Sequence, residues 1–338
     1  MSAVKTTKTS VFVDPMTIGW YYYGKKIIEA RGESKNMKTK NLEKEVRQLR
    51  AMRKGARIVR HTKKTAKKLH LGRKLAFGAG AGIFLIAPGR ASLKAAAPFA
   101  GRNFAHRGLH TEDKSVPENS LAAFAAAAAA GYGIELDVQL SKDRQVVVFH
   151  DATLDRVCGV KSRVDEKTYD ELHATSLCGT KETVPLFSDV LKCIDGRGPL
   201  IVELKTGKHN RELCRKTLAL LKDYRGDVCI ESFDPRIVRW FRFHAGKLIR
   251  GQLACRPSRY ERKDASKKAA FLLGNCLLNF LGRPQFIAYE VGRKPLTVKL
   301  AERLGAMRFC WTSHDMKNEK KNDAVIFELY TPEIKLLK

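Results

Sequence analysis

Acidic side chains recur at the ends of strand-like segments, and their spacing suggests metal chemistry. Glu135 and Asp137 lie two residues apart in IELDV, so both point to one face of a strand. Glu203 and Lys205 repeat this alternation in LIVELK. Carboxylates that meet at one place repel one another unless a cation lies between them, and an all-oxygen set suits a hard divalent ion, Mg²⁺ or Ca²⁺. We therefore expect Glu135, Asp137 and Glu203 to hold such an ion. The alternative is that the first two form the solvent face of an edge strand, but Glu203 repeats their pattern.

Two histidines stand at the ends of other strand-like segments, His106 in FAHRG and His150 in VVFHD. A single histidine is more often structural than catalytic. Two of them beside acids and cations favour an acid/base pair, in which one ring takes a proton and the other gives one. Together with a metal, Arg107 and Lys205 would bind a phosphate group and neutralise the charge that develops in phosphoryl transfer.

The elements that must position these residues alternate from residue 102 onward. Strands are expected at Asn103–His106, Gly133–Leu140, Val146–His150, Pro199–Leu204, Asp227–Phe233, Leu248–Leu253, Phe286–Glu290, Arg308–Thr312 and Val325–Glu328, with helices that include Ser120–Ala130, Phe187–Cys193, Arg211–Tyr224 and Lys267–Leu281. The linker SKDRQ is too short for a crossover helix, so the second and third strands form a hairpin. The pattern predicts an α/β fold, a (β/α)8 TIM barrel with an extra hairpin strand after the second barrel strand.

Charge is unevenly distributed over the 338 residues. Residues 1–100 hold 23 Lys and Arg against 5 Asp and Glu, whereas residues 101–338 hold 41 against 30. Such an excess favours an anionic partner, and charge alone leaves nucleic acid, anionic lipid headgroups and a phosphorylated substrate open. The eight cysteines show no zinc-type spacing, and we interpret them as buried thiols.

The N-terminal third divides into two segments. Residues 1–74 form a basic extension with Leu42, Val46, Leu49 and Met52 at helical spacing, which predicts either an amphipathic helix on a membrane surface or a solvated tail. Residues 75–101 contain the uncharged run LAFGAGAGIFLIAP. The run is short for a spanning helix, and a re-entrant segment and a buried helix remain open, but we expect a single N-terminal membrane anchor. The side on which the catalytic domain lies stays open, because flanking basic residues place it outside while free cysteines favour a reducing compartment.

Beyond these residues, the ordered motifs FAHRG, PENSLAAF, GIELDVQLSKDRQVVVFHDATLDRVCG, VPLFSDVL, LIVELK and ESFDP resemble the glycerophosphodiester phosphodiesterase family. The resemblance implies a catalytic domain over residues 102–338, a bound divalent metal, and hydrolysis of glycerophosphodiesters to sn-glycerol 3-phosphate and an alcohol. It also implies roles for single residues: His106 and His150 as the acid/base pair; Glu135, Asp137 and Glu203 as metal ligands; Arg107 and Lys205 at the phosphate; Glu118 and Asn119 near the site; and Trp311 at the barrel mouth.

The sequence departs from the family near its end, where IFELYTPE stands in place of a T-D-x-P motif, so Glu328 is a candidate substitute for the usual acid. The nucleophile, water or a substrate hydroxyl, stays open.

Two other functions also remain: a lysophospholipase D-like enzyme acting on membrane lipids, and a non-catalytic basic protein that binds membranes or nucleic acid. We expect a glycerophosphodiester or lysophospholipid substrate and an anionic membrane surface as partners, rather than nucleic acid.

Overall fold

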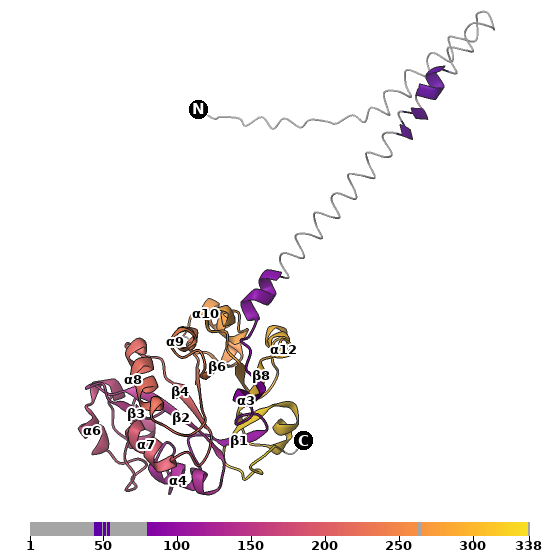
Figure 1. The fold of residues 1–338 in the computed structure, drawn as a ribbon. Helices are drawn as coiled ribbons and strands as arrows, with labels where there is room; N and C mark the ends of the chain where they lie inside the picture. Colours follow the sequence, from indigo (N-terminus) through magenta and orange to yellow (C-terminus); the bar gives the residue numbers. More distant parts are fainter. Residues whose placement is uncertain (1–43, 49, 52, 55–79, 262–264, 337–338) are drawn as a thin grey trace, which may run out of the picture. The chain divides into compact units, whose positions relative to one another are not determined.

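A computed structural model describes residues 44–48, 50–51, 53–54, 80–261 and 265–336. The chain forms two compact units, residues 1–77 and residues 78–338. The second unit contains a closed barrel, shown in Figure 1. Its parallel strands are β1 Arg102–Ala105, β2 Gly133–Leu140, β4 Leu200–Leu204, β5 Val228–Ser232, β6 Ile249–Ala254, β7 Phe286–Glu290, β8 Met307–Ser313 and β9 Ala324–Phe327. β1 pairs with both β2 and β9, which closes the barrel.

The extra strand is β3 Val146–Val148, which pairs antiparallel with β2 on the side away from β4. The predicted barrel and its hairpin are therefore confirmed. Alternation along each strand explains why these segments form a barrel: in β2, Ile134, Leu136 and Val138 join the apolar cluster shared with the surrounding helices, while the residues between them face inward.

Aromatic rings fill the interior near the amino ends of the strands. Phe104, Phe286 and Phe309 are fully buried there in one cluster. Gly133 leaves room for them, because a Cβ at this position would lie 2.3 Å from the Phe104 ring. The barrel interior is consequently a packed core rather than a channel.

Residues 80–336 also contain helices before and between the strands. They are α3 Leu93–Ala96, α4 Leu121–Ala129, α5 Asp155–Cys158, α6 Tyr169–His173, α7 Phe187–Ile194, α8 Asn210–Lys222, α9 Pro235–His244, α10 Lys267–Gly274, α11 Asn279–Gly282 and α12 Leu296–Arg303, with short 3₁₀ turns at η2 Val164–Glu166, η3 Pro257–Arg259 and η4 Met316–Lys321. The single helix expected at Lys267–Leu281 was wrong. It is broken into α10 and α11, because Cys276 has a left-handed backbone (φ 51°).

The apolar run of residues 75–88 lies partly outside the described residues. Residues 80–86 are helical, and Ile86 is buried in an apolar cluster with Ile287 of β7 and Val298 of α12. Within the part of the chain that the structure describes, no helix is long and apolar enough to cross a membrane. Residues 44–48 are also helical, and the rest of the basic extension expected at 1–74 falls almost entirely outside the described residues.

All eight cysteines are free thiols. Five of them are buried, as expected, whereas Cys158, Cys178 and Cys193 are only half-buried.

Candidate active site

Three carboxylates meet inside the barrel toward the carboxyl ends of its strands. Glu135 and Asp137 lie on β2, and Glu203 lies on the neighbouring β4, in register with Asp137. Their side chains are buried, with exposed fractions of 2%, 1% and 7%. One oxygen of each lies within 4.8 Å of the others. The pair on β2 therefore faces the barrel interior, and the edge-strand alternative is excluded.

This acid group fits a divalent cation. Oxygen ligands bind Mg²⁺ or Ca²⁺ at about 2.0–2.6 Å, so two ligands of one ion lie at most about 5 Å apart. The carboxylate oxygens of this group, within 4.8 Å of one another, meet that limit. Burial raises the pKa of Glu135 well above its usual range, and the charges of Asp137 and Glu203 raise it further. The pKa of Glu203 is raised by burial and by Asp137, although Lys205 opposes this. Glu135 and Glu203 are thus under-compensated by the chain's own cations, which is the electrostatic condition that a bound Mg²⁺ or Ca²⁺ would relieve.

Two cations border the acids. Lys205 Nζ lies 3.2 Å from Asp137 Oδ1 and 2.8 Å from Glu203 Oε1. Arg107 Nε lies 3.3 Å from Asp137 Oδ2, and its backbone N–H donates to Glu135 Oε2. Burial alone would raise the pKa of Asp137, but Lys205, His150 and Arg107 outweigh it and hold that pKa well below its usual range. Asp137 is therefore the carboxylate that stays ionised most readily.

The loop that contains the PEN motif positions Arg107 and Asp137. Glu118 Oε1 accepts from Arg107 Nη1 at 2.7 Å and also binds Arg156. Asn119 Nδ2 donates to Asp137 Oδ2 at 2.9 Å. Arg107 and Asn119 both have left-handed backbones, with φ of 56°, and the Asn119 N–H donates to the Arg107 carbonyl. Strained backbone of this kind persists where the surroundings enforce it, so Glu118 and Asn119 hold other site residues in place. Arg156 was not identified from the sequence.

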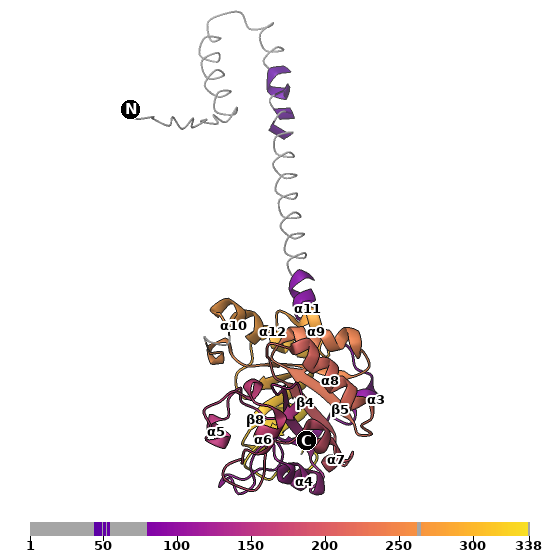
Figure 2. The same ribbon diagram turned by 90° about the vertical axis from the view of Figure 1, so that its left-hand side faces the viewer.

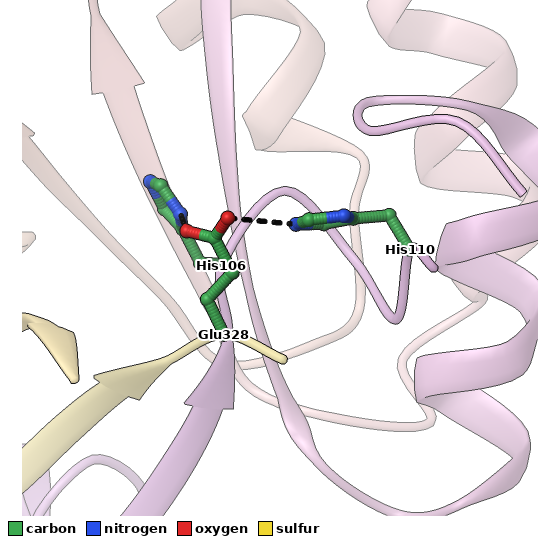
Figure 3. Close-up of side chains that lie close together, drawn as sticks. All are labelled: His106, His110 and Glu328. Atoms are coloured by element: carbon green, nitrogen blue, oxygen red, sulfur yellow. Dashed lines mark hydrogen bonds and ion pairs between the residues drawn. The ribbon is translucent and has the colours of Figure 1, made fainter. Parts of the chain in front are cut away.

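Glu328 connects two histidines at the end of β9, as Figure 3 shows. Its Oε2 lies 2.8 Å from His106 Nδ1, and its Oε1 lies 3.6 Å from His110 Nε2. The hydrogen bond directs the proton of the neutral His106 ring to Nδ1 and leaves Nε2, which lies 4.0 Å from Glu135 Oε2, as the exchanging atom. Burial lowers the pKa of His106 to about 4, with a further contribution from Arg107. The candidate substitute acid therefore holds the first histidine.

His150 is held in a similar way by the next residue along the chain. Its Nδ1 lies 2.6 Å from Asp151 Oδ1, and Arg156 binds the same carboxylate through its Nε at 2.7 Å. Burial raises the pKa of Asp151, but the bonds from His150 and Arg156 outweigh it and lower the pKa overall. Both predicted acid/base histidines consequently have one ring nitrogen engaged by a carboxylate.

A fourth acid, Glu231 on β5, was missed. It stands in register with Glu203, is 1% exposed, and its Oε2 has no hydrogen-bond partner among the described residues. Burial raises its pKa well above the usual range, as do the charges of Glu203 and Asp137. The alternation in VCIES carries the signal that could have revealed it. Trp311, at the end of β8, packs edge-on against Phe233 at 5.5 Å and donates to the Ala288 carbonyl, so it lies with aromatic neighbours rather than with the acids.

Comparison with known proteins identifies the family of this chain. Residues 106–329, more than half of the chain, match the Glycerophosphoryl diester phosphodiesterase family. The chain belongs to this family. Glycerophosphodiester phosphodiesterase from Caldanaerobacter subterraneus is 41% identical over 146 residues, which cover 40% of this chain and 59% of the relative. Lysophospholipase D GDPD1 of Rattus norvegicus is 34% identical over 140 residues, covering 38% and 43%. The chain thus spans less than two thirds of the length of these curated relatives.

Solved structures of the family share the barrel. A glycerophosphodiester phosphodiesterase from Parabacteroides distasonis superimposes with a TM-score of 0.51 at 24% identity, over 68% of this chain and 93% of that one. A phosphodiesterase from Oleispira antarctica, solved with the product sn-glycerol-3-phosphate, gives a TM-score of 0.54 at 21% identity over the same shares. At these identities the likeness establishes the barrel fold.

Proposed function

We propose that this chain hydrolyses glycerophosphodiesters to sn-glycerol 3-phosphate and an alcohol, with a divalent metal and two histidines. The observation that carries the proposal is the convergence of Glu135, Asp137 and Glu203 with two cations at the carboxyl end of the barrel. Family membership supports the reaction class. The acids would hold the metal, which when bound would neutralise them and withdraw electron density from a phosphate oxygen.

Arg107 and Lys205 bind the phosphate group in this scheme. Arg107 Nε is buried and lies 3.3 Å from Asp137 Oδ2, but it makes no hydrogen bond within the described part of the chain, so its N–H would be available to a phosphate oxygen. The pKa of Arg107 is raised, because Asp137, Glu118 and Glu135 outweigh the effect of burial, and the guanidinium stays charged. Fixed donors of this kind stabilise the charge that grows on the phosphoryl oxygens during transfer.

His106 and His150 exchange protons with the reacting oxygens. With Nδ1 held by Glu328 and by Asp151, respectively, each ring presents Nε2. One ring removes the proton of the nucleophile, and the other returns a proton to the departing alkoxide, so the proton balance closes without an added base.

Metal removal tests the proposal. Full-length protein stripped with EDTA should lose glycerophosphocholine hydrolysis, and added Mg²⁺ or Ca²⁺ should restore it. Activity that survives in excess EDTA, or in a His150→Ala variant, would contradict the scheme.

A lysophospholipase D-like activity is the second candidate, because relatives that carry that name are 34% and 31% identical to this chain over 140 and 139 residues. It uses the same site on a lipid substrate. Rates on lysophosphatidylcholine and on glycerophosphocholine, measured with one preparation, distinguish the two.

A non-catalytic binding role is the candidate from another class. The complete set of acids and histidines argues against it, since a barrel kept only for binding has no need of them. If the barrel proved inactive while the full chain bound DNA with a steep salt dependence, the binding role would replace the enzyme.

A further inference from the structure

Aromatic and arginine side chains form one continuous surface around α9, α11 and helical residues 80–86. The Phe84 and Phe280 rings are tilted against each other with their centres 5.7 Å apart, and the Arg283 guanidinium lies 4.6 Å from the Phe84 ring centre. Arg242 donates to the Phe280 carbonyl and lies 5.1 Å from the Phe243 ring centre. We call this surface the aromatic–arginine patch: Ile83, Phe84, Arg239, Arg242, Phe243, Phe280 and Arg283.

The patch exposes large apolar side chains that a solvated surface rarely carries together. Ile83, Phe84 and Phe243 are 51%, 56% and 64% exposed. Single exposed apolar residues are ordinary, but a contiguous group with cations among the rings marks an interaction surface. Nothing in the proposed chemistry uses these residues.

The segment that carries Phe84 is fixed to the barrel. Arg283 Nη1 donates to the carbonyls of Phe84 and Ala87, and Gly89 N–H donates to the Pro284 carbonyl. Figure 2 shows the purple helical segment meeting the barrel beside α11 and α9. The exposed rings are thus held in place by the fold.

The patch lies at the amino ends of the barrel strands. α11 ends shortly before β7 begins at Phe286, and α9 ends at His244 shortly before β6 begins at Ile249. The acids and histidines stand at the opposite ends of the strands. One height of the barrel therefore separates the patch from the active site.

We propose that the aromatic–arginine patch docks on an anionic lipid bilayer and holds the catalytic mouth away from it. Charge complementarity favours this occupant: the patch contains three arginines, and residues 1–77, which precede it in the sequence, contain 21 Lys and Arg against 5 Asp and Glu. Aromatic rings and arginines both suit the boundary between headgroups and acyl chains, where an apolar part and a polar part are accommodated together.

The orientation has a consequence for substrates, which rests on the proposed function. A mouth that faces water receives soluble glycerophosphodiesters directly, whereas a lipid still embedded in the same bilayer would have to leave it first. The patch therefore favours the glycerophosphodiesterase activity over the lysophospholipase D-like one.

Vesicle sedimentation of the full-length protein tests the docking surface. Vesicles of phosphatidylcholine with phosphatidylglycerol are compared with phosphatidylcholine alone. Phe84→Ser combined with Phe243→Ser should weaken binding to the anionic vesicles on the order of tenfold, because two rings no longer insert. Arg239→Gln should weaken it a few-fold and reduce the preference for phosphatidylglycerol.

Leu296→Ser is the matched control. Leu296 is 67% exposed and begins α12, after the carboxyl end of β7, so it belongs to the catalytic end. Its substitution should leave vesicle binding unchanged. If it weakened binding while the double variant did not, the mouth would face the membrane and the proposal would be overturned.

A second measurement does not depend on how the double variant folds. Trp240 stands one turn before Phe243 on α9, so brominated lipid should quench part of the wild-type fluorescence, and Trp240→Phe should remove that part. Absence of this quenching overturns the proposal. A double variant that binds vesicles normally but loses self-association also overturns it, because the patch would then be an interface between copies of the chain.

Both readouts are independent of catalysis. An inactive protein that binds vesicles through the patch would refute the proposed function alone. Full activity on glycerophosphocholine without patch-dependent binding would refute the docking alone.

Discussion

The two ends of the barrel interior are built from different side chains. At the amino end, Phe286 and Phe309 stack with ring centres 4.2 Å apart, and Phe104 lies 6.3 Å from Phe309. At the carboxyl end, buried carboxylates face one another with too few cations, and burial together with like charge raises the pKa of Glu135 and Glu231. One end stabilises the fold by packing, whereas the other stores repulsion between carboxylates that a bound cation would relieve.

The largest expected effect is at the acid end. Glu203→Gln keeps the shape of the side chain but removes one charge that the proposed metal needs and one partner of Lys205. We expect kcat on glycerophosphocholine to fall on the order of a thousandfold or more, with weaker metal binding by calorimetry. Stability without metal should stay level or rise, because less like charge is buried. A kcat within tenfold of wild type would remove Glu203 from the site.

Phe309→Ala should produce the opposite result. The ring is fully buried between two other rings, so its loss leaves a cavity, and we expect the free energy of unfolding to fall by about 3–5 kcal/mol in urea. Activity per folded molecule should hardly change. Phe243→Ala, at an exposed phenylalanine, is the control and should stay within about 0.5 kcal/mol. A large loss of kcat in the folded fraction would show that the two ends are not separable.

Acid should destabilise the catalytic end through His106. Its folded pKa of about 4 lies below the unfolded value of 6.5, so between these limits the unfolded chain binds more protons and stability falls as pH falls. In EDTA, the wild type should therefore lose on the order of 3 kcal/mol more than His106→Gln between pH 7 and pH 4. Denaturant titrations at several pH values measure this difference. Equal losses in both proteins would show that the buried ring is not held neutral.

The sequence predicted those features of the fold that depend on alternation of apolar and polar residues and on contacts between segments close in the chain. The strands β2 and β7 begin and end where the apolar pattern predicts, and the short SKDRQ linker correctly predicted that β3 returns antiparallel beside β2. Glu231 follows the same alternation in VCIES, which sends its side chain to the barrel interior, but no face was assigned to this strand from the sequence.

Pairings across long stretches of chain carried no such signal. Glu328 reaches His106 over 222 residues, and Arg156 reaches Glu118 over 38, because closure of the barrel brings their strands and loops together. The left-handed backbone of Cys276 was equally invisible, although Gly274 and Asn275 just before it are residue types that often end a helix. Such features follow from tertiary packing, which no local pattern encodes.

The smallest expected effect compares the two carboxylates that hold the histidines. Glu328→Gln and Asp151→Asn keep a hydrogen-bonding oxygen but remove the charge, so each should lower kcat about 10–100-fold with little change in KM. The loss should be greater for Glu328, because His106 is more buried than His150, with side-chain exposed fractions of 13% and 32%. Arg156 also binds Asp151, and water can partly replace the lost carboxylate at this more exposed position. Glu328→Asp keeps the charge on a shorter side chain. Compared with Glu328→Gln, it should recover only part of the activity if the position of the carboxylate matters, and most of it if the charge alone matters. An effect confined to KM would instead assign Glu328 to substrate binding.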